Sequence, residues 1–356
     1  MRSGRDGLER GVLADAFSLF VLVVMIPAPS AAVGPASRIG IVAIRRPALA
    51  TLVRAVKLGD EMEIERLATR IGVPRLEHAA DKGTPAERLA ALRAMPLCAD
   101  AWSSLSHLAT LATKAEDAEV ALAAATAARR IAEGLAPERI EAEEIPSDIA
   151  RDAAKTLLVG AKSPSLSAAV RSPLIMAVAG LRQVTAVDET ALVALLSDGN
   201  FEVRRAAAES LAGVSAADAA LGKTLGADSS AQVAAAAAAS LCRDVPSTAM
   251  VTPAKPPKAK DAKPVADKPA PPLQQLRAAA EARATALPPP ARERLRALAV
   301  DEQVTLADRL DLLGCLRVTP SPADRALLDE LAKKGPDAVK RRARSLGGGA
   351  GGAGGH

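Results

Sequence analysis

Apolar side chains recur at intervals of three and four residues through the middle of the chain, which is the period of an amphipathic helix. The pattern predicts a helix over 202–214, after a shorter helix over 188–197. Gly199 and Asn200 separate these helices, because both residues favour turns. One face of the longer helix carries Val203, Ala206, Ala207, Ser210, Leu211 and Val214. A single helix pair cannot bury its own apolar stripe, so neighbouring pairs are expected to stack on it.

The same pattern returns 30 residues later in the chain. The pairs of residues at this spacing are Asp198 and Asp228, Val203 and Val233, Leu211 and Leu241, and, far downstream, Leu316 and Leu346. A fixed period of this length is typical of stacked-repeat proteins. We therefore predict an all-α fold, an α-solenoid of stacked helical hairpins that is interrupted by a proline-rich linker.

This repeat resembles a HEAT repeat of the short bacterial kind, in which an Asp, a Val-Arg pair, two alanines and a final Leu follow in order. The resemblance is specific over 166–243 and loose over 84–165 and 273–346. It implies helix hairpins stacked into a solenoid. It does not by itself imply an activity, because this fold carries both enzymes and binding proteins.

The resemblance also implies a ladder of ion pairs between successive repeats, made by the Asp and by the Arg that follows Val. Asp198 and Arg204 occupy these two positions. The second copy keeps Asp228 but has Ala234 where Arg is expected, which predicts a break in the ladder there.

Composition divides the chain into further segments. An uncharged run over 16–26 follows several arginines and precedes small residues, which is typical of a secretory signal. We expect export to the periplasm or beyond, with a mature chain that begins near Val33. The alternative is an ordinary N-terminal helix in a cytoplasmic protein. The predicted segments are a signal peptide at 1–32, a helical lead-in at 33–83, a HEAT-like repeat domain at 84–244, a Pro/Lys/Ala-rich linker at 245–272, a C-terminal helical module at 273–346 and a glycine-rich disordered tail at 347–356.

The helix predicted before the linker has alanine at every position of 234–239, so it is apolar on all sides and something must cover it. We expect the module at 273–346 to dock there and to continue the solenoid. The alternative is a free module and a partner helix on the alanines. Cys242 and Cys315 would then end successive helices, and they are expected to stay unpaired because packed helices lie about 8–10 Å apart.

The composition gives little evidence of a catalytic or metal-binding site. Apolar residues make up 49% of the chain but aromatic residues only 1%, which suits close-packed helices better than a β-sandwich. His107, Trp102 and Cys98 are interpreted as packing residues, and the acidic cluster over 141–144 as a solvated face. The sequence lacks nucleophile, phosphate-loop and metal-ligand motifs. We therefore predict no catalytic, metal or cofactor site and no enzymatic activity.

Net charge is +5, which is a modest basic excess. The densest basic run lies at 333–344, and it is interpreted either as a solvated terminal helix or as a site for phosphate or anionic lipid. Nucleic acid is not expected as a partner, because Arg204 and Arg205 recur as Ala234 and Ala235 and no row of cations forms.

The predicted function is that of a non-enzymatic scaffold that binds a protein or peptide and has no stable transmembrane anchor. The alternatives are a cytoplasmic nucleic-acid-binding protein and a lyase-like enzyme subunit. The predicted partner-binding face consists of Glu202, Arg205, Glu209, Ala235 and Ala239.

Overall fold

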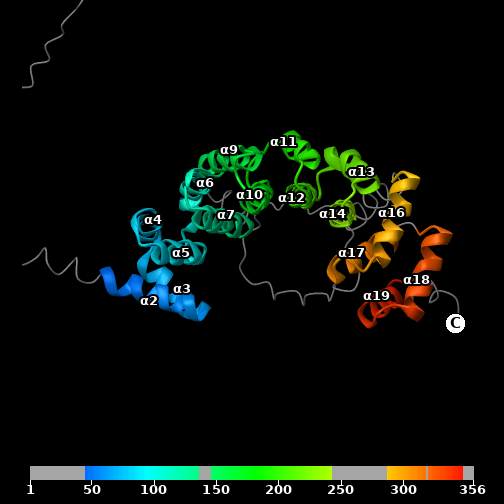
Figure 1. The fold of residues 1–356 in the computed structure, drawn as a ribbon, viewed down its shortest axis with the longest axis horizontal. Coiled ribbons are helices and arrows are strands. Elements are labelled where there is room, and N and C mark those ends of the chain that lie inside the picture. The colour runs from blue at the N-terminus through cyan, green and yellow to red at the C-terminus, as the bar shows by residue number, and fades with distance from the viewer. Residues whose placement is uncertain (1–44, 136–145, 243–286, 318–319, 348–356) are drawn as a thin grey trace, which may run out of the picture. The chain divides into compact units, whose positions relative to one another are not determined.

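The computed structural model divides into two units, Met1–Arg45 and Arg46–His356, and almost everything it describes belongs to the second unit. The described residues are 45–135, 146–242, 287–317 and 320–347. Every element in these ranges is a helix (Figure 1), which confirms the predicted all-α solenoid. The expected signal peptide, the linker at 245–272 and the tail from 348 onward lie outside the described residues.

The helices of the second unit follow one another as hairpins whose first and second members form two rows (Figure 1). Row A contains the first members, α4 (Val73–Lys82), α6 (Leu105–Lys114), α9 (Ser147–Lys162), α11 (Glu189–Ala194), α13 (Asp218–Ala227), α16 (Pro289–Val300) and α18 (Pro322–Lys334). Row B contains the second members, α5 (Pro85–Ala94), α7 (Ala118–Glu133), α10 (Ala168–Leu181), α12 (Phe201–Ser210), α14 (Ala231–Cys242), α17 (Leu306–Arg317) and α19 (Asp337–Gly347). Each helix of row B packs against the next one in the row, so this row forms a continuous core.

Helices α2 (Arg45–Leu58) and α3 (Glu61–Ile71) precede the rows, and short 3₁₀ turns fill several of the connections. These turns are Met95–Leu97, Ala101–Ser104, Leu195–Ser197 and Ser215–Ala217. The segment over 73–82, which the sequence did not mark as a helix, forms α4 and pairs with α5. Pro74 lies in the first turn of α4, where its missing N–H costs nothing, so it starts the helix rather than breaking it. The expected boundary between 83 and 84 thus falls inside a hairpin.

Helix ends follow local capping chemistry. Thr84 and Glu87 form a capping box at the start of α5, and the Asn200 side chain accepts a hydrogen bond from the Glu202 amide at the start of α12. Helix α12 ends at Ser210 rather than at the predicted residue 214. The chain turns instead at Gly213, whose φ of 77° is a left-handed conformation that suits glycine.

Small side chains allow the helices of row B to approach closely. Gly180 of α10 lies against the backbone of Ala132 in α7, and a Cβ atom at Gly180 would come within 2.8 Å of the Ala132 carbonyl carbon. Alanine and leucine supply most of the buried core. This composition fills a narrow space between helices without aromatic side chains, which explains the low aromatic content of the chain.

Helices α16 and α17 pack on the repeat that precedes the linker, with α17 against α14 and α16 against α13. The run of alanines over 234–238 is buried in the resulting structure. Leu312, Leu313 and Leu316 of α17 are fully buried in the same core. The apolar helix α14 is thus covered by residues of this same chain.

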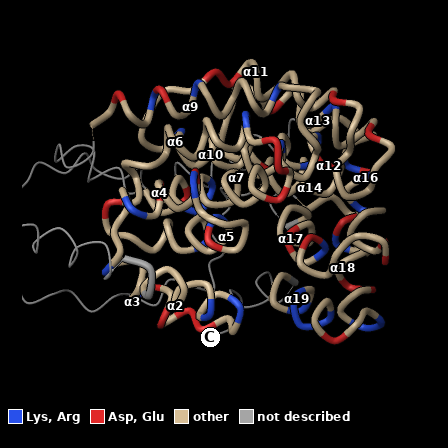
Figure 2. Tube along the Cα trace, turned by 60° about the vertical axis from the view of Figure 1, so that its left-hand side comes forward, with Lys and Arg blue, Asp and Glu red and all other residues tan. Residues whose placement is uncertain are grey.

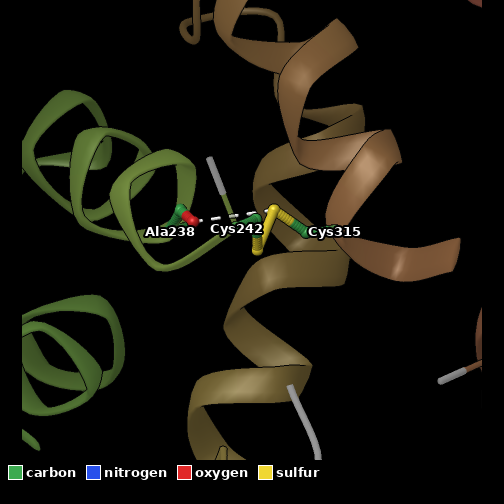
Figure 3. The surroundings of a disulfide bond; sticks show 3 residues. All are labelled: Ala238, Cys242 and Cys315. Atoms are coloured by element: carbon green, nitrogen blue, oxygen red, sulfur yellow. Dashed lines mark hydrogen bonds between the residues drawn. A yellow bond between two sulfur atoms is a disulfide. The ribbon is translucent and has the colours of Figure 1, made fainter. Parts of the chain in front are cut away.

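A disulfide joins α14 to α17 (Figure 3). Cys242 and Cys315 form the bond, with their Cα atoms 5.4 Å apart, and the sulfur of Cys315 lies 3.6 Å from the Ala238 carbonyl oxygen. The prediction that these cysteines stay unpaired is therefore wrong. Packed helix axes lie about 8–10 Å apart, but each Cα lies about 2.3 Å from its own axis, so residues that face each other come within disulfide range.

Candidate binding surface

A surface pocket of about 390 Å³ crosses row B from α7 to α14. Its lining combines apolar side chains with charged side chains from neighbouring helices. The lining residues are Arg129 of α7, Ala169, Ser172, Pro173 and Met176 of α10, Phe201, Glu202, Arg205, Ala206 and Glu209 of α12, and Gln232 of α14. Because four helices contribute to it, the pocket exists only when successive repeats are stacked.

Phe201 is the most exposed large apolar residue of this pocket, with 44% of its surface accessible. Its position follows from the cap, because Asn200 starts α12 and places Phe201 in the first helical turn. Met176 and Pro173 of α10 are half-buried beside it in the pocket lining. An aromatic ring held on a helix end beside small apolar residues is a suitable contact for an apolar side chain of a partner.

Pro173 gives the pocket a polar feature as well. It lies inside α10 and has no N–H, so the carbonyl of Ala169, four residues earlier, lacks its normal helical donor. Ala169 itself is exposed and lines the pocket. A partner that presents a backbone N–H or a side-chain donor can satisfy this carbonyl.

Two arginines on the rim are held by glutamates of their own helices. Arg205 Nε donates to Glu209 Oε1 at 2.8 Å, and Arg129 Nε donates to Glu133 Oε1 at 2.6 Å. All four side chains remain about one-third to two-fifths exposed. Such pairs contribute little to stability, but they fix the direction of the guanidinium groups beside the pocket. Glu202, which is exposed, adds a negative charge to the same rim.

The structure places three of the predicted face residues in this pocket, namely Glu202, Arg205 and Glu209. Ala235 is fully buried, so its inclusion in a partner-binding face is wrong. Helix α17 packs on α14, and Asp308 near the start of α17 comes within 4.0 Å of Arg205 of α12. Ala239 is partly buried on the same helix and does not line the pocket.

Ion pairs between hairpins hold the repeats in register. Arg204 Nε lies 2.8 Å from Asp228 Oδ2, and Arg204 also donates to the backbone carbonyl of Asp198 at 3.0 Å. The Arg204 and Asp228 side chains are only 15% and 8% exposed. Asp198 itself accepts from Arg171 of α10 at 2.6 Å. The structure thus places Asp198, Arg204 and Asp228 in one continuous series of contacts between successive hairpins.

Arg171 belongs to this series of contacts between hairpins, although the sequence pattern did not identify it. Its side chain is 8% exposed and also donates to the Ala161 carbonyl at 2.8 Å. It lies 33 residues before Arg204, so a strict period of 30 passes over it. The signal was nevertheless present, because Val170 precedes Arg171 just as Val203 precedes Arg204.

The ladder aspartates are held in the charged form. Burial raises the pKa of Asp228, but hydrogen bonds from Arg204 and the Ser230 amide, with the charge of Arg204, leave the pKa below its ordinary value. Asp198 behaves in the same way, because Arg171 and the Asn200 amide outweigh its burial. Asp301 repeats the local turn by accepting from the Gln303 amide at 2.9 Å. The arginine that would face it in the repeat pattern is replaced by Ala234.

Comparison with known proteins assigns no family. No protein family and no curated protein matches the sequence. Among solved structures, Kap121p is similar with a TM-score of 0.38 and 14% identity over 79% of this chain and 32% of that one. SYS-1 is similar with a TM-score of 0.28 and 11% identity over 84% of this chain and 57% of that one. The chain spans about a third of Kap121p and just over half of SYS-1.

The remaining residues considered in the sequence analysis do not form a catalytic or metal site in the described structure. His107 Nε2 lies 3.3 Å from Asp81 Oδ1 without hydrogen-bond geometry, and both residues line a second pocket formed by α4, α5, α6 and the segment that follows α6. Burial raises the pKa of Cys98 to about 11, which makes it a poor nucleophile. Trp102 is partly buried against the core. Within the described ranges, no group of His, Cys, Asp or Glu has the arrangement of a metal site, and the acidic cluster at 141–144 lies outside them.

Proposed function

We propose that this protein is a non-enzymatic scaffold that binds a peptide segment of a partner protein across row B. The observation that carries the proposal is the pocket shared by α7, α10, α12 and α14. Its apolar lining accepts an apolar side chain against Phe201, and its rim offers oriented guanidinium and carboxylate groups. The carbonyl of Ala169, which has no i+4 amide donor because of Pro173, accepts a donor from the same segment. Such a mixture of an apolar centre and a polar rim is typical of surfaces that recognise peptides.

Export is part of the proposal. Disulfides persist in oxidising compartments, and the Cys242–Cys315 bond agrees with that setting. The three arginines within the first ten residues, followed by an uncharged apolar stretch, support the same location. Cell fractionation with N-terminal sequencing tests it. A mature chain that begins near Val33 in the envelope fraction is expected, and an intact chain in the cytoplasm would contradict export.

Binding is tested by selecting peptides from a displayed random library on the full-length protein. Selected peptides are expected to carry an apolar anchor, and Phe201→Ser should weaken them about thirtyfold, since a central aromatic contact contributes about 2 kcal/mol. Val159 of α9 provides a matched control, because it is 71% exposed and lies on row A. Val159→Ser should leave the affinity unchanged.

Two outcomes of this experiment would overturn the proposed site. Selected peptides could bind the Phe201→Ser and Val159→Ser variants equally well, which would place the interaction elsewhere. Alternatively, the library could yield no binder above background on a folded protein.

A further inference from the structure

The last two described helices carry a concentration of positive charge. Between residues 333 and 344 the chain has six cations and one acid, Asp337. The cations are Lys333, Lys334, Lys340, Arg341, Arg342 and Arg344. Neither the repeat pattern nor the proposed peptide pocket uses them, so this charge needs a separate explanation.

The cations of both helices lie on one hairpin, because α18 packs against α19 (Figure 2). Arg344 Nε donates to the Ala332 carbonyl at 3.1 Å, so the last turn of α18 lies beside α19. Lys333 and Lys334 follow directly in that last turn. On α19, Lys340 and Arg344 are four residues apart and therefore share a face.

Most of these cations face solvent. Lys333, Lys334, Arg341 and Arg344 are exposed, and Lys340 is half-buried. Arg342 differs, because its guanidinium lies over Gly314 of α17. The basic end is defined here as Lys333, Lys334, Lys340, Arg341 and Arg344. Its one ion pair among the described residues joins Lys334 to Glu330 at 3.7 Å, and both side chains are well exposed.

The apolar side of α19 is already occupied. Val339, Ala343 and Leu346 are buried against the rest of the chain, which fixes the helix with its basic face outward. No helix in the described part of the chain is long and apolar enough to cross a bilayer. Whatever binds the basic end must therefore be held by charge at a surface rather than by insertion of this helix.

We propose that the basic end binds the surface of a bilayer that contains anionic phospholipids. A helix of eleven residues is about 16 Å long, so its cations form a broad and shallow patch that suits a sheet of headgroups. Clustered Lys and Arg at a protein surface bind such membranes through many weak contacts that add together. Adsorption of the basic end would hold the end of row B at the membrane.

Nucleic acid fits the same chemistry less well. The positive charge does not continue along row B, because Arg171 and Arg204 are neutralised by Asp198 and Asp228 and the next ladder position is Ala234. The Cys242–Cys315 disulfide also indicates an oxidising compartment, where anionic lipids rather than nucleic acids are the abundant polyanions.

Vesicle co-sedimentation of the full-length protein tests the proposal. Vesicles made of equal parts phosphatidylglycerol and phosphatidylcholine should bind the protein at low salt, and vesicles of phosphatidylcholine alone should not. Each cation near an anionic surface strengthens binding about fivefold, so replacing Lys333, Lys340 and Arg341 together by Gln should weaken it about a hundredfold. None of these three side chains has a hydrogen bond or ion pair in the described structure that the substitution would break.

A second triple variant separates a local patch from net charge. Arg75, Arg130 and Lys223 are exposed cations on α4, α7 and α13, and replacing all three by Gln removes the same charge. This control should bind the anionic vesicles as the unmodified protein does. Equal weakening in both triple variants would overturn the proposal.

Two competition experiments complete the test. Release of the protein by millimolar glycerol phosphate would mean that a free phosphate, rather than a membrane, is the ligand. Displacement from vesicles by a short DNA duplex at an equal concentration of phosphate groups would favour nucleic acid. Retention on the vesicles in both cases supports the membrane.

Discussion

Replacing Arg204 by Ala tests how strongly the ladder between repeats stabilises the fold. Arg204 contacts Asp228 through Nε at 2.8 Å and through a terminal nitrogen at 3.1 Å, and its other terminal nitrogen donates to the Asp198 carbonyl. The substitution leaves the Asp228 carboxylate, which is 8% exposed, without its counter-charge. Breaking a buried pair in this way costs about 3–5 kcal/mol.

The expected cost here is smaller than for a fully buried pair. Asp228 keeps its hydrogen bond from the Ser230 amide at 2.8 Å, and both partners retain some contact with water. We therefore expect a loss of about 2–3 kcal/mol in the free energy of unfolding. This corresponds to a melting temperature lower by about 5 °C or more for a domain of this size.

Urea denaturation followed by circular dichroism at neutral pH measures this change. Arg205→Ala is the matched control, because Arg205 is the next residue of α12 and its contacts with Glu209 and, at 4.0 Å, with Asp308 are partly exposed and together contribute about 1 kcal/mol or less. The double variant of Arg204→Ala with Asp228→Ala should cost less than the sum of the single variants. Equal destabilisation by Arg204→Ala and Arg205→Ala would refute the ladder as a source of stability.

Three further predictions concern helix packing, the disulfide and stability at low pH. Gly180→Ala should destabilise the fold by about 1–3 kcal/mol, because the new Cβ meets the Ala132 backbone. Gly222→Ala should stabilise it by about 0.5–1 kcal/mol, because a Cβ there meets no heavy atom within 4 Å. Thermal melts compare the two variants, and equal melting temperatures would contradict the close approach of α7 and α10. Replacing Cys242 and Cys315 together by Ser should lower the free energy of unfolding by about 4 kcal/mol, because the disulfide closes a loop with a sequence separation of 73. Denaturation with and without reductant measures the contribution of the disulfide. If reductant has no effect on the unmodified protein, the bond is ruled out. The pKa values of Asp198 and Asp228 are lowered in the fold, as is that of Asp324, a buried residue of α18 that pairs with Arg292 and Arg296. Their contribution to stability is therefore complete above the ordinary pKa near 4 and is lost as pH falls through the lower folded values. Melting temperatures measured from pH 6 down to pH 2 should therefore fall most steeply below about pH 4, and less steeply for Arg204→Ala; parallel curves would argue against this assignment.

Local pattern was sufficient to predict the helices of the central repeats. The period of 30 residues and the stripe on α12 depend only on neighbours along the chain, and they predicted both members of the hairpin. Helix α4 was not predicted, because glycine and proline, here Gly72 and Pro74, ordinarily interrupt a helical pattern. In the structure they mark its first turn.

The candidate surface was predictable only in part, because neighbours distant in sequence decide which positions are exposed. Arg205 and Ala235 occupy equivalent positions in two repeats, yet the first lines a pocket and the second is buried. Helix α17, which covers α14, follows a long interruption of the period. The lining of the pocket likewise combines Met176 and Phe201 from different hairpins, and no local spacing relates them.

The disulfide determines what happens to the protein when a protease cuts its polypeptide. Cys242 and Cys315 lie on either side of the segment rich in proline and lysine, so one protease cleavage within that segment gives two polypeptides that stay covalently attached. Such a clipped molecule keeps its full mass and its α14–α17 contact, and it separates into fragments only when a thiol reduces the bond. In an oxidising environment, the protein would therefore tolerate a cut in this segment and still act as one body.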